Sequence, residues 1–450
     1  MSQGGYSSSS DDDISDDVGS NVSDVSYTGT LLDVEERGAI STDSVTLLKD
    51  QLLESMDNIS DKRKSTREHA LKVFIKILSK TSKGSEMLEG REETVTFKLL
   101  NVVKRNKKNS DAILALKALE LVAITFGASN QGMYDECVKV LFPMIKTSRK
   151  DAVRGAAIRA AAMICFVSTI EESSTIDCMG MFESVFRDAV RYLMDGDEDG
   201  DEDSSKKKRK TKKKNKTSFL GLTASLNGWG LLATTRSEKY LGTSAFKTIT
   251  PLLNELLEHD SNEVRKAAGQ NAALLAQYRF KIHHEEEDDE DEDKDEDKDE
   301  KELLDTIRSQ LKALSIENSR YKSKRDMKAQ RSFFRAVCGT LESGSAPEMK
   351  IVLRGEKVIF DSWTDVKRFE AFRTSLGGGI STYLQSDTVL RQVFDLGPVR
   401  VVSSADRLSK LEKRMYRSPN SELSKARTID RARERGKKAA ARNAVYSGGF

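Results

Sequence analysis

The stretch DAVRGAA, residues 151–157, decides the fold, because its pattern returns along the chain at a regular interval. A polar start, an Arg and then small or apolar residues appear again as STREHAL at residues 65–71 and as NEVRKAA at residues 262–268. Arg67 and Arg154 are 87 positions apart, and Arg154 and Arg265 are 88 apart once a charged segment, 195–217, is left out. Both intervals are close to two repeats of about 44 residues.

Two intermediate copies fall where that interval places them, as SDAILALK at residues 110–117 and LTASLNGW at residues 222–229. A period of roughly 40 to 47 residues is typical of HEAT and armadillo arrays. Small residues let neighbouring helices approach closely, and each repeat buries its apolar face against the next. The alternative, an irregular helical domain whose alanines are ordinary core, does not account for a spacing that holds at five places. We therefore predict an all-α armadillo/HEAT-like repeat domain over residues 44–283.

Charge is segregated into blocks, although the net charge is only +2. Residues 1–43 are acidic, rich in Ser and poor in apolar side chains, which predicts a disordered tail. The segment 195–217 has no apolar residue to anchor it, so we expect a disordered loop within the array. Segregated charge indicates charged macromolecular partners more than small-molecule chemistry.

The second half of that loop is strongly basic and supports two interpretations, a nuclear-import signal or an RNA-contacting loop. Basic runs are also common in loops that simply face solvent, so neither interpretation is decided by the residues alone. The candidate residues are Lys206, Lys207, Lys208, Arg209, Lys210, Lys212, Lys213 and Lys214.

After the repeats the pattern changes. Residues 284–302 are predicted to form an acidic linker or a solvated helix extension. Residues 303–398 read as a small α+β module: a helical stretch, then alternating apolar residues on both sides of Arg354-Gly355-Glu356, which predict a β-hairpin. A helix from Trp363 ends at three consecutive glycines, 377–379, and another helix is expected over 386–394.

The basic tail, residues 399–450, holds 14 Lys and Arg residues against 5 Asp and Glu residues. Its run at about 418–445 is rich in helix formers, with Ser418 as a cap and Pro419 in the first turn. This helix lacks an apolar stripe wide enough to pack on a core, so it gains most from a polyanion such as RNA. The alternative is a solvated, half-disordered tail. The candidate RNA-binding residues are Lys425, Arg427, Arg431, Arg433, Arg435, Lys437, Lys438 and Arg442.

Motifs for catalysis or for small ligands are missing from the sequence, so we predict no catalytic, cofactor-binding or metal site and no small-molecule substrate. The three glycines at 377–379 lack the residues of a phosphate-binding loop. The four Cys and four His residues have no zinc spacing, and the scattered Cys fit a reducing compartment. No apolar stretch approaches the length of a membrane span, and the amino terminus does not resemble a secretory signal.

Several motifs resemble the interferon-related developmental regulator family. They are residues 60–71, RSFFRAV at 331–337, LESGSAPEMKIVLRGEKVIFDSW at 341–363, AFRTSLGGGISTYLQSD at 371–387, LRQVFDLGP at 390–398 and SKARTIDRARERGKKAA at 424–440. The resemblance implies an armadillo-like body. It also implies either of two roles, that of a factor occupying idle ribosomes or that of a transcriptional co-regulator.

In the ribosomal role the body would block tRNA sites and the basic terminal helix would lie in the mRNA path, so rRNA would be the partner. This sequence departs from the family pattern in its long Lys block and in the late part of its tail, where Gly436 and the alanines dilute the charge. The alternative is a nuclear scaffold that binds protein partners on the helical-repeat surface. These two hypotheses predict a cytoplasmic and nuclear distribution.

Overall fold

The computed structural model describes residues 42–105, 110–127, 130–194, 219–286, 296–317, 324–353 and 356–398, together with Lys425 and Ile429 in the basic tail. The contacts divide the chain into two compact units. The first holds the helices and strands described below except for Glu356, the first residue of the second strand, and the second consists of residues 354–356 and 399–450.

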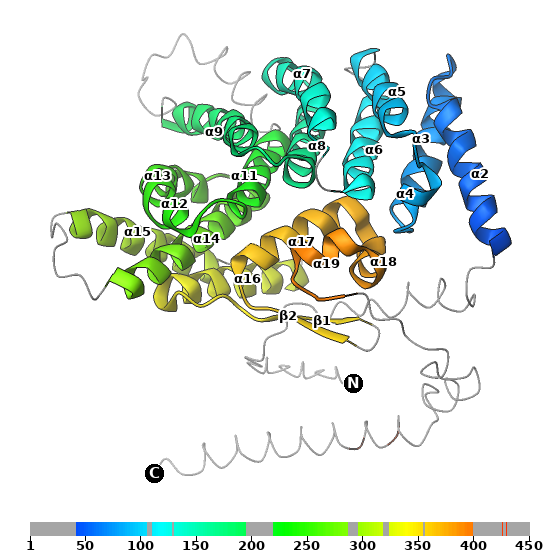
Figure 1. Cartoon of the computed structure of the whole chain (residues 1–450). Helices are drawn as coiled ribbons and strands as arrows, with labels where there is room; N and C mark the ends of the chain where they lie inside the picture. The colour runs from blue at the N-terminus through cyan, green and yellow to red at the C-terminus, as the bar shows by residue number, and fades with distance from the viewer. Residues whose placement is uncertain are drawn as a thin grey trace, which may run out of the picture. The chain divides into compact units, whose positions relative to one another are not determined.

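Within the described part of the first unit, the long helices pack as six antiparallel pairs, each with a first and a second helix (Figure 1). The first helices are α2 (Thr42–Asn58), α5 (Glu92–Arg105), α7 (Gln131–Thr147), α9 (Glu172–Met194), α13 (Phe246–Leu257) and α15 (Glu296–Ile316). The second helices are α3 (Lys64–Leu78), α6 (Ser110–Phe126), α8 (Asp151–Ser168), α11 (Leu220–Ala233), α14 (Asn262–Glu286) and α16 (Lys324–Ser343). Short turns α4 (Gly84–Met87), α12 (Glu238–Tyr240) and a π-helical turn, Leu241–Ala245, precede two of the first helices.

The second helices stack on one another in chain order, from α3 through α6, α8, α11 and α14 to α16. Contacts between neighbouring elements recur at the predicted period. Arg67 bonds to Asp111, 44 positions on, and the Tyr134 hydroxyl donates to the carbonyl of Ser174, 40 positions on. The Asn271 amide donates to the carbonyl of Leu226, 45 positions back. The armadillo/HEAT-like fold class is thereby confirmed, since stacked repeats place equivalent residues side by side.

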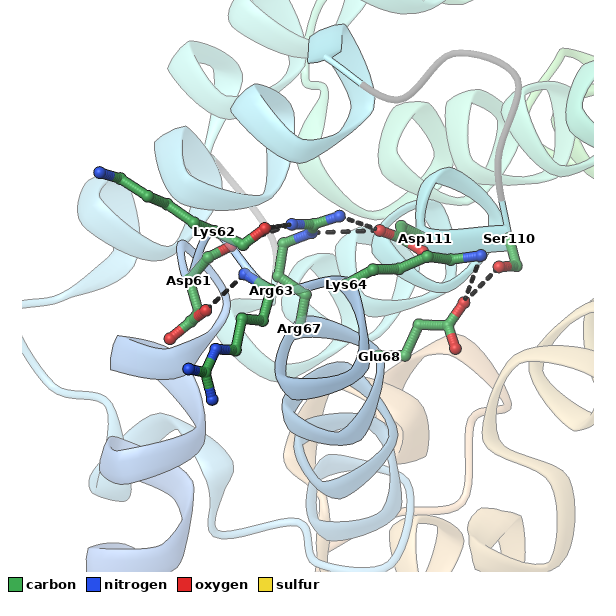
Figure 2. Close-up of polar contacts among 8 residues, drawn as sticks. All are labelled: Asp61, Lys62, Arg63, Lys64, Arg67, Glu68, Ser110 and Asp111. Carbon is green, nitrogen blue, oxygen red and sulfur yellow. Dashed lines mark hydrogen bonds and ion pairs between the residues drawn. The ribbon is translucent and has the colours of Figure 1, made fainter.

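All second helices run in the same direction, so their N-termini lie along one edge of the array, which we call the leading edge. Figure 2 shows its first step, where Asp111 at the start of α6 is fully buried. One carboxylate oxygen of Asp111 accepts hydrogen bonds from Nε and Nη2 of Arg67, at 3.1 and 2.6 Å. The same guanidinium donates to the carbonyls of Asp61 and Lys62. Arg67 therefore ties the loop before α3 to the start of the next second helix.

Small residues bring α8 and α11 into close contact, as the sequence pattern predicts. A Cβ added to Gly155 would lie 3.0 Å from the backbone oxygen of Leu220. Asp151, at the start of the same heptapeptide, accepts the backbone amides of Leu220 and Gly221 at 2.7 and 2.8 Å. The DAVRGAA stretch thus supplies both the close approach and the cap of the following second helix. Arg154 donates to the carbonyl of Ile145 at 2.9 Å, which is a structural role.

The segment 303–398, treated in the sequence analysis as a module of its own, packs within the same compact unit as the repeats. Its first part contributes to the sixth helical pair, because α15 packs on α13 and α16 packs on α14. The predicted hairpin forms from β1 (Met349–Leu353) and β2 (Glu356–Phe360). The acidic stretch 284–302 contributes, among its described residues, the end of α14 and the start of α15.

Three further helices complete the unit: α17 (Trp363–Leu376), α18 (Ile380–Ser386) and α19 (Thr388–Val393). The predicted helix from Trp363 and its end at the glycines are confirmed, with Ser362 as the cap of α17. The helix predicted over 386–394 corresponds to α19, but its predicted start was wrong, because residue 386 is the end of α18 and α19 begins at Thr388. A single turn of 3-10 helix over the glycines, Gly377–Gly379, allows the chain to turn and resume helix at once.

Removing the carboxylate of Asp111 should destabilise the array by about 3 kcal/mol, because a buried charge pair would lose one partner. The measurement is urea unfolding of an Asp111→Ala variant. Lys64→Gln is the control, since Lys64 forms an exposed pair with Glu68 and its loss should change stability by less than about 0.5 kcal/mol. Equal stability of the two variants would contradict this role of Arg67 and Asp111.

Candidate functional site

Of the eight predicted RNA-binding residues in the tail, only Lys425 belongs to the described residues. Lys425 has helical backbone and an exposed side chain, and so does Ile429 one turn later. The other seven residues, and all eight candidates in the loop at 206–214, lie outside the described residues. Their proposed roles therefore stay predictions.

The described residues on either side of the 195–218 segment lie at the leading edge. Helix α9 ends at Met194, and the chain is described again from Phe219, just before α11. The start of α11 is fixed by Asp151, which accepts its first amides. The predicted basic loop therefore leaves and rejoins the array between a first and a second helix.

The second helices present one face to α17, which we call the inner face. Helix α17 packs against α6, α11 and α14 and covers this face, as the orange helices of Figure 1 show. Its N-terminus is held by the side chain of Gln277 on α14, which accepts the Trp363 amide at 3.0 Å. The Trp363 side chain is buried and donates to Thr340 of α16 at 2.9 Å. Trp363 is therefore a core anchor, as the sequence predicts.

In the middle of α17, Lys367 points into the array and is only 3% exposed. Its ammonium donates to the side-chain oxygen of Gln270 at 3.0 Å and to that of Asn227 at 3.4 Å. The Gln270 amide in turn donates to Glu370 at 2.7 Å. Burial lowers the pKa of Lys367 to about 8, and the nearby charge of Glu370 opposes that shift. The result is a buried polar cluster that joins α17 to α11 and α14.

Arg368 makes a second group of contacts along the same helix. Its guanidinium donates to the carbonyl of Thr234 at 2.6 Å and to that of Val393 at 3.2 Å, which joins α11, α17 and α19. The Phe372 ring packs edge-on against Phe166 of α8, with 5.8 Å between centroids. Burial lowers the pKa of Arg368, although the guanidinium keeps its charge at neutral pH.

The last turn of α17 and the start of α18 reach the first two repeats. Ser375 donates to the carboxylate of Glu120 on α6 at 3.0 Å, and the Tyr383 hydroxyl donates to the carbonyl of Leu78 on α3 at 2.6 Å. Gly379 lies directly against Ser79, because an added Cβ would overlap the Ser79 carbonyl oxygen. Contacts to α17 and α18 thus extend along the inner face from α14 to α3.

All four cysteines of the chain are buried, and none forms a disulfide. The thiol of Cys165 has a lowered pKa, caused first by a hydrogen bond from Cys178, yet both side chains are fully buried. Burial raises the pKa of Cys137 to about 12. Among the described residues, no group of three or more His, Cys, Asp or Glu side chains is placed to hold a metal ion. The described helices also include none with the length and apolar character of a membrane span.

The inner-face contacts of Lys367, Arg368 and Glu120 were not predicted from the sequence. One signal was available: Lys367 lies one turn after Trp363, among the apolar positions of α17, where an exposed lysine is not expected.

Comparison with models of protein families shows to which family the chain belongs. The model of the "Interferon-related developmental regulator (IFRD)" family matches residues 17–342, well over half of the chain. The chain belongs to this family. A second model, "Interferon-related protein conserved region", matches residues 388–439.

Relatives of this family member extend over most of its length. Interferon-related developmental regulator 2 of Mus musculus is 27% identical over 402 residues, covering 87% of this chain and 83% of the relative. Interferon-related developmental regulator 1 of Homo sapiens is 27% identical over 400 residues, covering 85% and 79%. Among solved structures, a designed armadillo repeat protein matches with a TM-score of 0.36 and 13% identity, over 64% of this chain and 99% of that one.

The two family models match different parts of this chain. The first ends within α16, so it covers the helical pairs, and the second begins at α19 and includes most of the basic tail. Seven of the eight candidate RNA-binding residues fall inside the second model, and Arg442 falls outside it.

Replacing Gly379 by Ala should loosen α18 from the array, because the new methyl group would overlap the Ser79 carbonyl. We expect a loss of about 2 kcal/mol in unfolding free energy and faster amide exchange in α18. Gly378→Ala is the matched control, since an added Cβ there meets nothing within 4 Å. If the amides of α18 exchange equally slowly in both variants, the contact with Ser79 does not attach α18 to the array.

Lys367 should make stability depend on pH. Its folded-state pKa is depressed, so between about pH 8 and pH 10.5 the unfolded chain binds more protons and stability rises with pH. The free energy of unfolding of the native chain, minus that of Lys367→Met, should therefore rise by on the order of 3 kcal/mol across this window. A flat difference would contradict the burial of Lys367. Lys72→Met, at an exposed position, is the matched control for the loss of a lysine.

Proposed function

We propose that this family member is a non-enzymatic ribosome-binding factor that associates with translationally inactive ribosomes. Its body would block tRNA sites, and its basic terminal helix would lie in the mRNA path. The observation that carries the proposal is the basic tail. Of its 14 Lys and Arg residues, 13 lie at 400–438, inside the region that the second family model matches.

The electrostatics of the tail favour rRNA as the partner. A helix with Lys and Arg side chains on nearly every side can neutralise phosphates that approach from any direction, which suits a channel lined by RNA. No RNA-recognition motif that reads bases is visible in the sequence, so recognition would be by shape and charge, as is usual for structured RNA. The protein would then distribute where ribosomes are, chiefly in the cytoplasm.

The occupied inner face supports this proposal over peptide binding in the array. Helical-repeat proteins commonly bind extended partners on the surface formed by their inner helices. Here α17 covers that surface through Lys367, Arg368 and Ser375, and these contacts would have to break before a peptide could replace it. Partner binding through the tail and the outer surfaces needs no such rearrangement.

The ribosomal proposal is tested with purified empty ribosomes and full-length protein, by pelleting over a range of KCl concentrations. Substituting Gln at all eight tail candidates should weaken binding at least tenfold at moderate salt, because up to eight phosphate contacts are lost. The matched control replaces Arg by Lys at positions 427, 431, 433, 435 and 442, which keeps the charge and should keep most of the affinity. Unchanged binding and salt dependence in the Gln variant would exclude the tail as the anchor.

A second function, that of a nuclear transcriptional co-regulator, is favoured by the Lys block at 206–214, whose composition suits nuclear import. In that role the outer helices would bind protein partners. Gln substitution of this block separates the two functions. Loss of nuclear protein with unchanged ribosome binding would assign the block to import, whereas reduced ribosome binding would assign it to RNA contact.

A further inference from the structure

The described helix ends and connecting residues at the leading edge of the first three repeats carry a concentration of exposed basic side chains. They lie where α2 is followed by α3, α5 by α6 and α7 by α8. The exposed bases at these three places are Lys62, Arg63, Lys64, Lys104, Arg105, Lys146, Arg149 and Lys150. They come from stretches about 40 residues apart in sequence, so only the stacking of the repeats brings them to one edge.

Stacking also sets the spacing of these bases. Helices α3, α6 and α8 pack side by side, and packed helices lie about 8 to 10 Å apart. Three neighbouring loops therefore extend over roughly 20 Å, a length over which one nucleic-acid strand carries about six phosphates.

The carboxylates of this edge are buried, paired with a basic side chain or bonded to backbone amides, and the exposed Asp57 pairs with Lys98. Asp111 is fully buried against Arg67, and Asp151 accepts two amides at the start of α11. Glu68 accepts a hydrogen bond from Ser110 and pairs with Lys64, as Figure 2 shows. Asp61 accepts the amide of Arg63. Positive charge consequently dominates the outer surface of the edge.

The opposite edge of the same repeats gives the contrast. Exposed bases there, Lys80, Lys83 and Arg91, are interspersed with exposed acids, Glu86, Glu89 and Glu171. The fifth repeat also differs, because its loop before α14 carries Glu258 and Asp260. Of the described places compared, only the leading edge of the first three repeats therefore carries exposed basic residues without an equal number of exposed acidic ones.

We propose that this basic leading edge is a second RNA-binding surface, which contacts the phosphate backbone of structured RNA. The proposal rests on the proposed ribosomal function and adds a contact from the array to that of the tail. Two separate phosphate-binding surfaces would fix the orientation of the protein on RNA, because phosphate contacts set position and register. A single helix in a channel leaves rotation about its axis free.

The test compares full-length variants for binding to a fluorescein-labelled RNA hairpin, by anisotropy, and to empty ribosomes, by pelleting, at 50 to 200 mM KCl. The edge variant carries Gln at six positions of the leading edge. The matched control carries Gln at three exposed basic residues of the opposite edge, and because every substituted side chain is exposed, neither variant removes a buried contact. The edge variant is Lys62→Gln, Arg63→Gln, Lys104→Gln, Arg105→Gln, Lys146→Gln and Arg149→Gln; the control is Lys80→Gln, Lys83→Gln and Arg91→Gln.

We expect the edge variant to lose at least tenfold in affinity for both RNA targets while melting like the native chain. The slope of log affinity against log salt should become shallower by roughly 0.7 for each lost phosphate contact, and the control should match the native chain. Native affinity of the edge variant, with loss only in the tail variant, would overturn this proposal and keep the ribosomal function. If the native chain itself does not bind ribosomes, both fail. Unchanged RNA affinity with weakened binding of poly-glutamate would overturn it in favour of an acidic protein partner.

Discussion

The attachment of each second helix to the next is the constraint on which the rest of the structure depends. Arg67 fixes the start of α6 through Asp111, and Asp151 fixes the start of α11 through two backbone amides. These bonds set the register between repeats, while small residues such as Gly155 permit the short distance. Because all second helices then run in the same direction, the loops of successive repeats meet at one edge and one continuous face is available to α17.

Two consequences for function follow from that arrangement. The face on which helical-repeat proteins commonly bind partners is covered by α17 and α18 of the same chain, through contacts reaching from α14 to α3. The surfaces left for partners are the outer helices, the edges and the basic tail. Since the leading edge and the tail are both basic, one polyanionic partner could engage both, and structured RNA is such a partner.

The repeats could be predicted from sequence because the residues that recur in each copy form bonds to the adjacent copy. Arg67 and Asp111 belong to adjacent copies, so the spacing in sequence directly reflects the spacing in space. The position of α17 could not be predicted in this way. Tyr383 and Leu78 are 305 positions apart, and Ser375 and Glu120 are 255 apart, and each contact is a single polar bond without a local pattern. The polar cluster around Lys367 depends on three elements meeting, which no one segment encodes. Most of the predicted tail and loop residues lie outside the described residues, so for them the sequence remains the only guide.

Sedimentation of the full-length protein in cell lysate through a sucrose gradient tests the central claim most directly, with and without ribonuclease, at low and moderate salt. A factor for inactive ribosomes should migrate with single ribosomes and not with polysomes, and its migration should be sensitive to salt. Protein that stays at the top of the gradient under every condition would contradict the ribosomal account and favour the nuclear co-regulator.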